Sequence, residues 1–262
     1  MMQRLAPYQI GLWLAEYINL RCQLCHIHRS ESQVSSVTAS LHPNHIYQRL
    51  STGLLCPLCQ DNIAWLPPVF NVDIAASISL PVQAATYYDY PVRQAIRAFK
   101  HHEDMTKLPL LVHVLRQLPR PMGCHSSNSV ILPMPTTSSR LAERGFDPVT
   151  ILSAYLSKHW DIPIWRGVQR IDHTVSQQGL TRAERLTNLN DAFLLNELLP
   201  VKRVLLFDDV ATTGASLQAL ARTLYGESSF HDQNSLHNKI SAPASYPYHL
   251  SAYALAHGSN NK

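Results

Sequence analysis

The residues best suited to chemistry lie in segment 204–217, which reads VLLFDDVATTGASL. Two adjacent carboxylates, Asp208 and Asp209, follow a hydrophobic run that is typical of a buried strand. A turn with one glycine and three hydroxyls comes next and opens a helix, over residues 211–216. Carboxylates can hold the hydroxyls of a sugar, and backbone N–H groups at a helix N-terminus bind phosphate. The segment therefore predicts a site for a ribose 5-phosphate.

An ordinary strand–turn–helix would use these two acids only as helix caps. A cap needs one acid, and two adjacent carboxylates repel each other, which costs stability unless a ligand uses them. The segment fits neither a Walker loop, which needs Gly-Lys-Ser/Thr, nor the glycine fingerprint of a Rossmann fold. The sugar-phosphate interpretation is therefore preferred.

Four of the five cysteines form two C-x-x-C pairs, CQLC and CPLC. Each pair presents two thiolates from one tight turn, and two such turns complete a tetrahedral zinc shell. The 30 residues between the pairs are a wide spacing, but loop-closure entropy grows only logarithmically with length. Four unrelated thiols or two redox pairs are the alternatives, although neither pair has the βαβ setting of a thioredoxin-like site. We expect a structural, non-catalytic zinc site at Cys22, Cys25, Cys56 and Cys59.

Composition excludes several classes of protein. The chain has 262 residues, which suggests one or two domains at about 150 residues per domain. Its 45% hydrophobic and 15% charged residues argue against disorder and against fibrous or coiled-coil proteins. The net charge of +4 is too small to diagnose a nucleic-acid partner.

Hydrophobic patterning predicts no membrane span, because no apolar run reaches the roughly 18 residues that a bilayer requires. The apolar stretch at 10–20 is interrupted by Glu16 and Asn19, and it indicates an amphipathic helix rather than a signal peptide. We expect a soluble, cytoplasmic protein.

Two prolines at 67–68 divide the chain into two predicted domains. Residues 1–66 form a zinc-ribbon-like four-cysteine module with a long polar insert at 30–51, and residues 67–262 form an α/β domain. We expect helices over 91–104, 148–160, 181–189 and 215–224, strands over 129–135, 162–165, 201–207 and 248–256, and a polar loop over 227–247. Alternating strands and helices imply a mostly parallel, doubly wound sheet, which binds ligands at its carboxyl edge.

Segment 204–217 closely resembles the phosphoribosyl-pyrophosphate (PRPP) signature of type I phosphoribosyltransferases. The whole chain resembles the ComF family, which is associated with DNA uptake during natural competence and whose relatives include the GntX proteins. Five motifs carry this resemblance in the family's order: the two C-x-x-C pairs, the set Tyr88, Arg93, Phe99 and Lys100, the stretch 132–146, the stretch 170–193, and the signature itself.

The resemblance implies a type I phosphoribosyltransferase-like domain with a parallel sheet flanked by helices, joined to the small zinc-binding module. Asp208 and Asp209 would hold the ribose, and the 5-phosphate would be held by Ala211, Thr212, Thr213, Gly214, Ala215 and Ser216. The loop that carries Thr136, Thr137, Arg140 and Arg144 resembles the pyrophosphate loop, where hydroxyls and arginines satisfy phosphate oxygens.

Several basic residues match the family but also have an ordinary explanation. Arg182 and Arg185 lie in the region 170–188 that closes over the sugar, where they could stabilise charge in a transition state. A solvated helix face would explain these arginines equally well. Lys100 also matches a family position, and snorkelling from an amphipathic helix would explain it equally well.

Two departures from the family pattern narrow the predictions. The family usually continues RGF with Asn-Gln, whereas this chain has Asp147-Pro148, a helix-start signal. Purine-salvage members of the superfamily place an acid where Thr212 stands, to move a proton on the base. Thr212 cannot do so near neutral pH, so a purine acceptor of that type is disfavoured.

Two functions remain open. In the first, the protein is a Mg²⁺-dependent phosphoribosyltransferase, and thus a glycosyltransferase. PRPP binds at 208–216, an acceptor attacks C1 of the ribose, and pyrophosphate leaves. In the second, the fold is a non-catalytic scaffold that binds single-stranded DNA and serves the DNA-uptake machinery. Basic residues do not alternate with aromatics as a stacking platform requires, but Arg93, Arg97, Lys100, Arg140, Arg144, Arg182 and Arg185 could converge in space.

Overall fold

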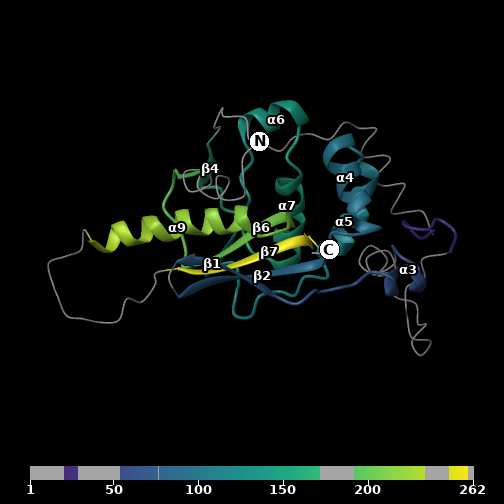
Figure 1. Ribbon diagram of the computed structural model, residues 1–262, viewed down its shortest axis with the longest axis horizontal. Coiled ribbons are helices and arrows are strands. Elements are labelled where there is room, and N and C mark those ends of the chain that lie inside the picture. The colour runs from purple at the N-terminus through teal and green to yellow at the C-terminus, as the bar shows by residue number, and fades with distance from the viewer. Residues whose placement is uncertain (1–20, 29–53, 76, 172–191, 234–247, 259–262) are drawn as a thin grey trace.

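A five-stranded sheet forms the centre of the computed structural model, which describes residues 21–28, 54–75, 77–171, 192–233 and 248–258. The strand order is β1-β2-β7-β6-β3 (Figure 1). The strands are β1 (Phe70–Ala75), β2 (Ile78–Tyr87), β3 (Ser129–Pro133), β6 (Arg203–Ala211) and β7 (His249–His257). β2, β7, β6 and β3 run parallel, while β1 pairs antiparallel with β2. The expected mostly parallel α/β sheet is confirmed.

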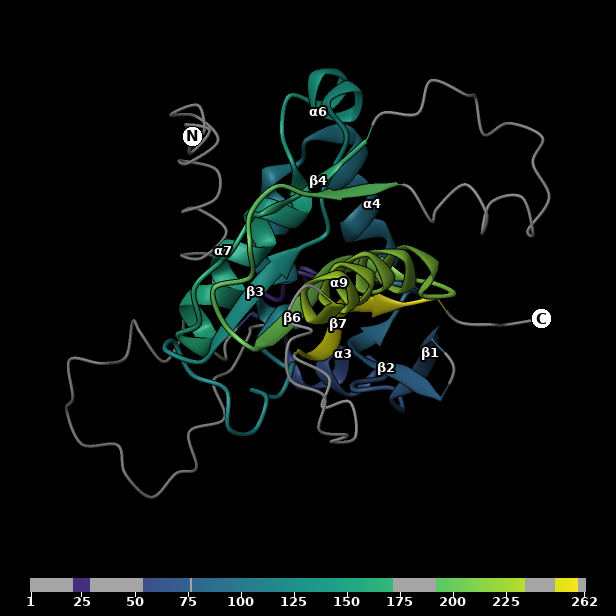
Figure 2. The same cartoon turned by 90° about the vertical axis from the view of Figure 1, so that its left-hand side faces the viewer.

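Helices cover both faces of this sheet. On one face, α5 (Leu108–Leu115) and α7 (Pro148–Trp160) contact each other, and α4 (Val92–His102) packs against α5. On the other face, α9 (Ala215–Gln233) packs against β1 and β6 and against the small antiparallel sheet of β4 (Val168–Arg170) and β5 (Phe193–Leu195). Parallel strands need crossover connections of this kind, which are usually helices. Figure 2 shows α9 over β6 and β7, with α7 beside β3.

Several predicted elements are confirmed. The helix at 91–104 is α4, and the helix at 148–160 is α7, whose N-cap Asp147 accepts a hydrogen bond from the Val149 amide at 3.1 Å. The strands at 129–135 and 248–256 are β3 and β7. The predicted helix at 181–189, the helix at 10–20 and the polar insert at 30–51 lie outside the described residues.

Other expectations need correction. The predicted strand at 162–165 is reduced to a single parallel bridge between Ile164 and Ile131, so it is not a full strand. The last helix continues to Gln233, which places the start of the predicted polar loop at 227 inside α9. Strands β1 and β2, which begin at Phe70 and Ile78, were not among the predicted strands. Within β2, consecutive residues are buried only from Ala84 to Thr86, and buried and more exposed residues alternate before them.

None of the helices in the described part of the chain is long and apolar enough to cross a membrane.

The connection between β6 and α9 depends on Gly214. Its φ of +73° lies in the left-handed region, and a Cβ there would meet Val72 Cγ1 at 2.7 Å and Phe70 at 3.3 Å. Gly145, which ends α6 (Ser138–Arg144), has a similar φ of +70° but nothing within 4 Å of the same position. The two glycines therefore share a backbone requirement and differ in the space around them.

We expect Gly214→Ala to lower the free energy of unfolding by roughly 2–4 kcal/mol, from backbone strain and overpacking together. Gly145→Ala is the matched control, with a loss of about 1–2 kcal/mol from the backbone alone. Urea unfolding of both variants measures the difference. Equal losses would mean that β1 does not confine the loop.

Candidate functional site

The four parallel strands end at a common edge of the sheet, where the predicted site residues gather. β2, β3, β6 and β7 end at Tyr87, Pro133, Ala211 and His257. The loop after β3 leads through Thr136 and Thr137 into α6, and the loop after β6 leads through Gly214 into α9. Pro133, the last residue of β3, pairs with Phe207, so the loop after β3 begins next to Asp208 of β6. This edge is where open α/β sheets bind ligands.

The two acids lie within β6 rather than after it. Beyond Phe207 the strand leaves β3 but keeps its pairing with β7, with Asp208 opposite Ala254 and Ala211 opposite His257. Successive side chains of a strand point to opposite faces, so the two carboxylates do not start from the same side. The Tyr253 ring, opposite Phe207, contacts Trp160 of α7, which assigns Phe207 and Asp209 to the α7 face.

Asp209 is buried and paired with a cation. Its side chain is 6% exposed, and its Oδ2 lies 2.6 Å from Nζ of Lys100, on α4. Desolvation makes an unpaired carboxylate very costly at such a position, so the ion pair is what allows the charge to remain.

Asp208 is half-buried and has no cation in direct contact among the described residues. Its Oδ1 accepts a hydrogen bond from the Asp209 amide at 2.8 Å. Burial and the neighbouring Asp209 carboxylate raise the pKa of Asp208 to about 8, against the opposing effect of Lys100. The folded chain therefore holds an acid whose charge is unfavourable until a ligand contacts it, a feature typical of functional sites.

The start of the loop after β6 is hydrogen-bonded to the end of β7. Nδ1 of His257 lies 2.9 Å from the Ala211 carbonyl oxygen and must donate to it, and the Gly258 amide donates to the same oxygen at 3.0 Å. The Phe70 ring lies 4.3 Å from the His257 ring. The predicted phosphate ligands Thr212 and Thr213 are exposed, and the first turn of α9 leaves amide groups without intrahelical acceptors. This arrangement can bind an anion.

Sequence reasoning missed Phe70, His257 and Gly258. The only available signal was that His257 ends a strand, because parallel strands end at the same edge.

The loop after β3 uses part of its polar chemistry internally. The Thr137 hydroxyl caps α6 by accepting from the Arg140 amide at 3.3 Å, and it lies 3.0 Å from Ser139 Oγ. Thr136 and Arg144 are half-buried and Arg140 is exposed. Arg185, predicted to act in the transition state, lies outside the described residues together with Arg182.

Basic side chains from α4 and α6 converge beside the acids. Burial and then the charges of Arg144, Lys100, Arg97 and His102 lower the pKa of His101. Among the described residues, the side chains of Arg93, Arg97, Arg140 and Arg144 have no acidic partner. The structure thus brings Arg97 of α4 and Arg144 of α6 close to the same residue, His101.

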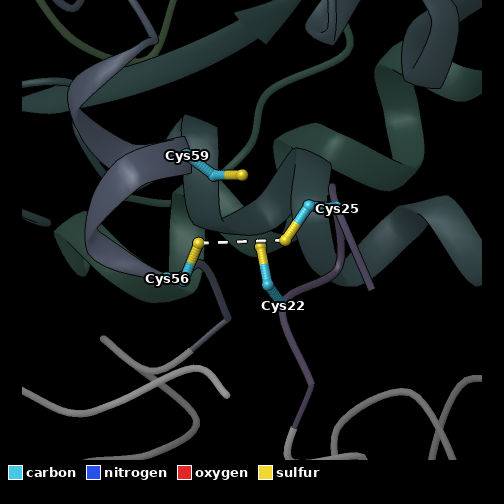
Figure 3. Close-up of side chains that lie close together, drawn as sticks. All are labelled: Cys22, Cys25, Cys56 and Cys59. Atoms are coloured by element: carbon cyan, nitrogen blue, oxygen red, sulfur yellow. Dashed lines mark hydrogen bonds between the residues drawn. The ribbon is translucent and has the colours of Figure 1, made fainter. Parts of the chain in front are cut away.

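The four cysteines of the two C-x-x-C pairs form one cluster, with Cys56 and Cys59 on α3 (Pro57–Asp61) and its N-cap (Figure 3). Their Sγ atoms all lie within 4.8 Å of one another, and Cys25 and Cys56 are 3.9 Å apart. A tetrahedral zinc ion with Zn–S bonds of about 2.3 Å needs sulfurs about 3.8 Å apart. The cluster fits zinc. Neither His26 nor His28, both exposed, belongs to it.

The thiols also show why a cation suits this cluster. Backbone amides of His28 and Ile27 lower the pKa of Cys25 to about 6. Burial raises the pKa of Cys56 and of Cys59, and Cys22 and Cys25 raise both further, although hydrogen bonds from Cys59 lower the pKa of Cys56. Four thiolates packed this closely are unfavourable without a positive ion, and a metal stabilises them together.

We expect the purified chain to carry one zinc ion, and Cys59→Ser to lose most of it because an incomplete shell binds weakly. Elemental analysis against protein concentration measures the stoichiometry. Cys124→Ser is the matched control, since Cys124 is a buried thiol outside the cluster. Loss of zinc in both variants, or in neither, would contradict a four-cysteine site.

The two acids should respond in opposite ways to amide substitution. Between about pH 4 and pH 8 the unfolded chain ionises Asp208 while the folded chain keeps it protonated, so stability falls as the pH rises. Asp208→Asn removes this cost and should raise the stability at pH 8 by at least about 1 kcal/mol, or roughly 2–4 °C. Asp209→Asn leaves Lys100 without its partner and should cost about 1–3 kcal/mol.

Thermal unfolding of wild type and both variants between pH 5 and pH 8.5 measures these effects. The gain from Asp208→Asn should grow with pH. A loss of stability in both variants at every pH would contradict the raised pKa assigned to Asp208.

No protein-family model matches the chain. A curated protein, competence protein F of Haemophilus influenzae, is 35% identical over 147 residues. The matched segment covers 53% of this chain and 63% of that protein, so the match spans less than two thirds of the relative's length. Over the matched segment, the chain is similar to this protein.

Proposed function

We propose that the protein binds PRPP, or a related ribose phosphate, at the carboxyl edge of the sheet. The observation that carries the proposal is the strand–loop–helix of residues 208–216. Asp209 is paired with Lys100, the pKa of Asp208 is raised, and an exposed loop with hydroxyl side chains follows at the N-terminus of α9. A carboxylate that is unfavourable in the free protein gains most when the hydroxyl groups of a polyol donate hydrogen bonds to it. The adjacent loop at 136–144 offers hydroxyls and arginines for further phosphates.

In this proposal, different residues bind different parts of PRPP. Asp208 and Asp209 accept from the ribose hydroxyls, and residues 211–216 hold the 5-phosphate through amide and hydroxyl groups. Thr136, Arg140 and Arg144 would bind the pyrophosphate, and Arg185 would stabilise charge in the transition state. A Mg²⁺ ion bound with PRPP would neutralise charge on the leaving pyrophosphate. Attack of an acceptor on C1 with loss of pyrophosphate would make the protein a phosphoribosyltransferase.

The name of the similar curated protein indicates the biological process in which this chain would act. A protein called competence protein F is its curated relative, so we infer a competence-related role in DNA uptake for this chain. The same proposal covers a type I phosphoribosyltransferase-like domain over residues 67–262 and a structural zinc module over residues 1–66. The cysteine cluster supports the zinc part of this division.

A second candidate function is the binding of single-stranded DNA by the same fold as a scaffold. It is favoured by Arg97 of α4 and Arg144 of α6, whose charges both act on His101 and which have no acidic partner among the described residues. Unpaired arginines suit a phosphate backbone, and such binding would weaken steeply with salt. The two functions are compatible, because the arginines and the acids are different groups on one edge.

Calorimetric titration with PRPP, with and without Mg²⁺, tests the first function. We expect metal-dependent binding that the double variant Asp208→Asn/Asp209→Asn loses by at least about tenfold, because both sugar acceptors are gone. The zinc content and the thermal unfolding of the variant serve as the folding control.

The same samples discriminate the two functions. No binding of PRPP to folded, zinc-loaded wild type would refute the sugar-phosphate site. Salt-sensitive binding of an oligodeoxythymidine that persists in the double variant, and that Arg97→Ala/Arg144→Ala weakens, would favour the scaffold. Release of pyrophosphate from PRPP by the wild type would favour the enzyme.

A further inference from the structure

The last turn of α4 contacts both halves of the candidate site through consecutive residues. The Phe99 ring packs edge-on against Phe146 at 5.4 Å, directly after the turn that ends α6. Lys100 reaches Asp209 on β6, and His101 lies close enough to Arg144 of α6 for its charge to be felt. The helix therefore connects the loop after β3 to the acids of β6.

Lys100 is not a snorkelling surface lysine. Such a side chain lays its carbon stem on apolar surface and keeps its ammonium group in water. Here the ammonium group lies 2.6 Å from a carboxylate whose side chain is 6% exposed, and the lysine side chain itself is 23% exposed. The other ion pair of the described residues, Lys107 with Asp104, is local, 3.9 Å long and more exposed.

We propose that Lys100 is a positioning residue that holds the Asp209 side chain turned toward α4, so that the site presents a fixed acceptor to the sugar. The inference rests on the proposed function of this site.

Two physical arguments support this role. A buried carboxylate without its cation would take up a proton or rotate toward water, and either change removes an acceptor from the edge of the sheet. The same ammonium group also lowers the repulsion between the two adjacent carboxylates, since its charge favours the ionised form of Asp208 as well. Lys100 therefore acts through the acids and need not contact the ligand.

Four variants and one control test this inference by calorimetric titration with Mg²⁺ and PRPP at a fixed pH. Lys100→Met keeps the length of the side chain and removes its charge, and it should weaken binding at least tenfold. Lys100→Arg keeps the charge and should recover most of the affinity. Lys107→Met removes a lysine from the neighbouring, exposed ion pair and should bind as the wild type does.

The decisive comparison is Lys100→Met in an Asp209→Asn background. If Lys100 acts through Asp209, the second substitution adds less than about twofold to the loss, because its target is already gone. Full additivity would overturn the inference and indicate that Lys100 contacts a phosphate directly. Wild-type affinity in Lys100→Met would overturn it as well.

Thermal unfolding of the same set separates this inference from the proposed function. A wild type that fails to bind PRPP refutes the proposed function and the positioning role together. The unfolding cycle is independent of ligand, and non-additive losses in Lys100→Met and Asp209→Asn are expected for a true ion pair. Additive losses there would overturn the structural basis of the inference even if PRPP binds.

Discussion

The pairing of β6 with β7 beyond the end of β3 is the constraint on which the candidate site depends. β3 pairs with β6 up to Pro133 and Phe207, whereas β7 pairs with it as far as Ala211. Beyond Phe207, one side of β6 is therefore still hydrogen-bonded to β7, while its other side no longer pairs with β3. Asp208 and Asp209 lie in this stretch, where Asp208 is half-buried and Asp209 is buried. A rigid backbone beside an open edge is what a preorganised ligand site needs.

Charged groups occur both at this edge of the sheet and in the cysteine cluster. Lys100 compensates the more buried acid, and the less buried acid remains raised in pKa. The cysteine cluster is joined to the sheet by neutral contacts: the Trp65 indole donates to the Gln60 carbonyl, and the Thr86 hydroxyl donates to the Ala64 carbonyl. A metal in that cluster would therefore stabilise the segment that leads into β1 and β2.

The strong local signals in the sequence predicted their structures well. The acid–proline pair at 147–148 opens α7, and the hydrophobic run after residue 201 became a buried strand. The two C-x-x-C pairs form one cluster, because the motif itself sets the turn that presents each pair. The predicted strand at 162–165 was wrong as a strand, because only Ile164 pairs, through a single bridge to Ile131 at the free edge of β3.

The sequence by itself determined the alternation of strands and helices, the four zinc-type ligands and the acid–hydroxyl segment, because each depends on residues that are neighbours along the chain. Tertiary structure alone decided that Lys100 meets Asp209, that His257 holds the Ala211 carbonyl, and that the arginines of α4 and α6 converge. These contacts join residues that are far apart in sequence, and they exist only once parallel strands end at a common edge. No local pattern specifies such a meeting, because strand order and crossover direction set it.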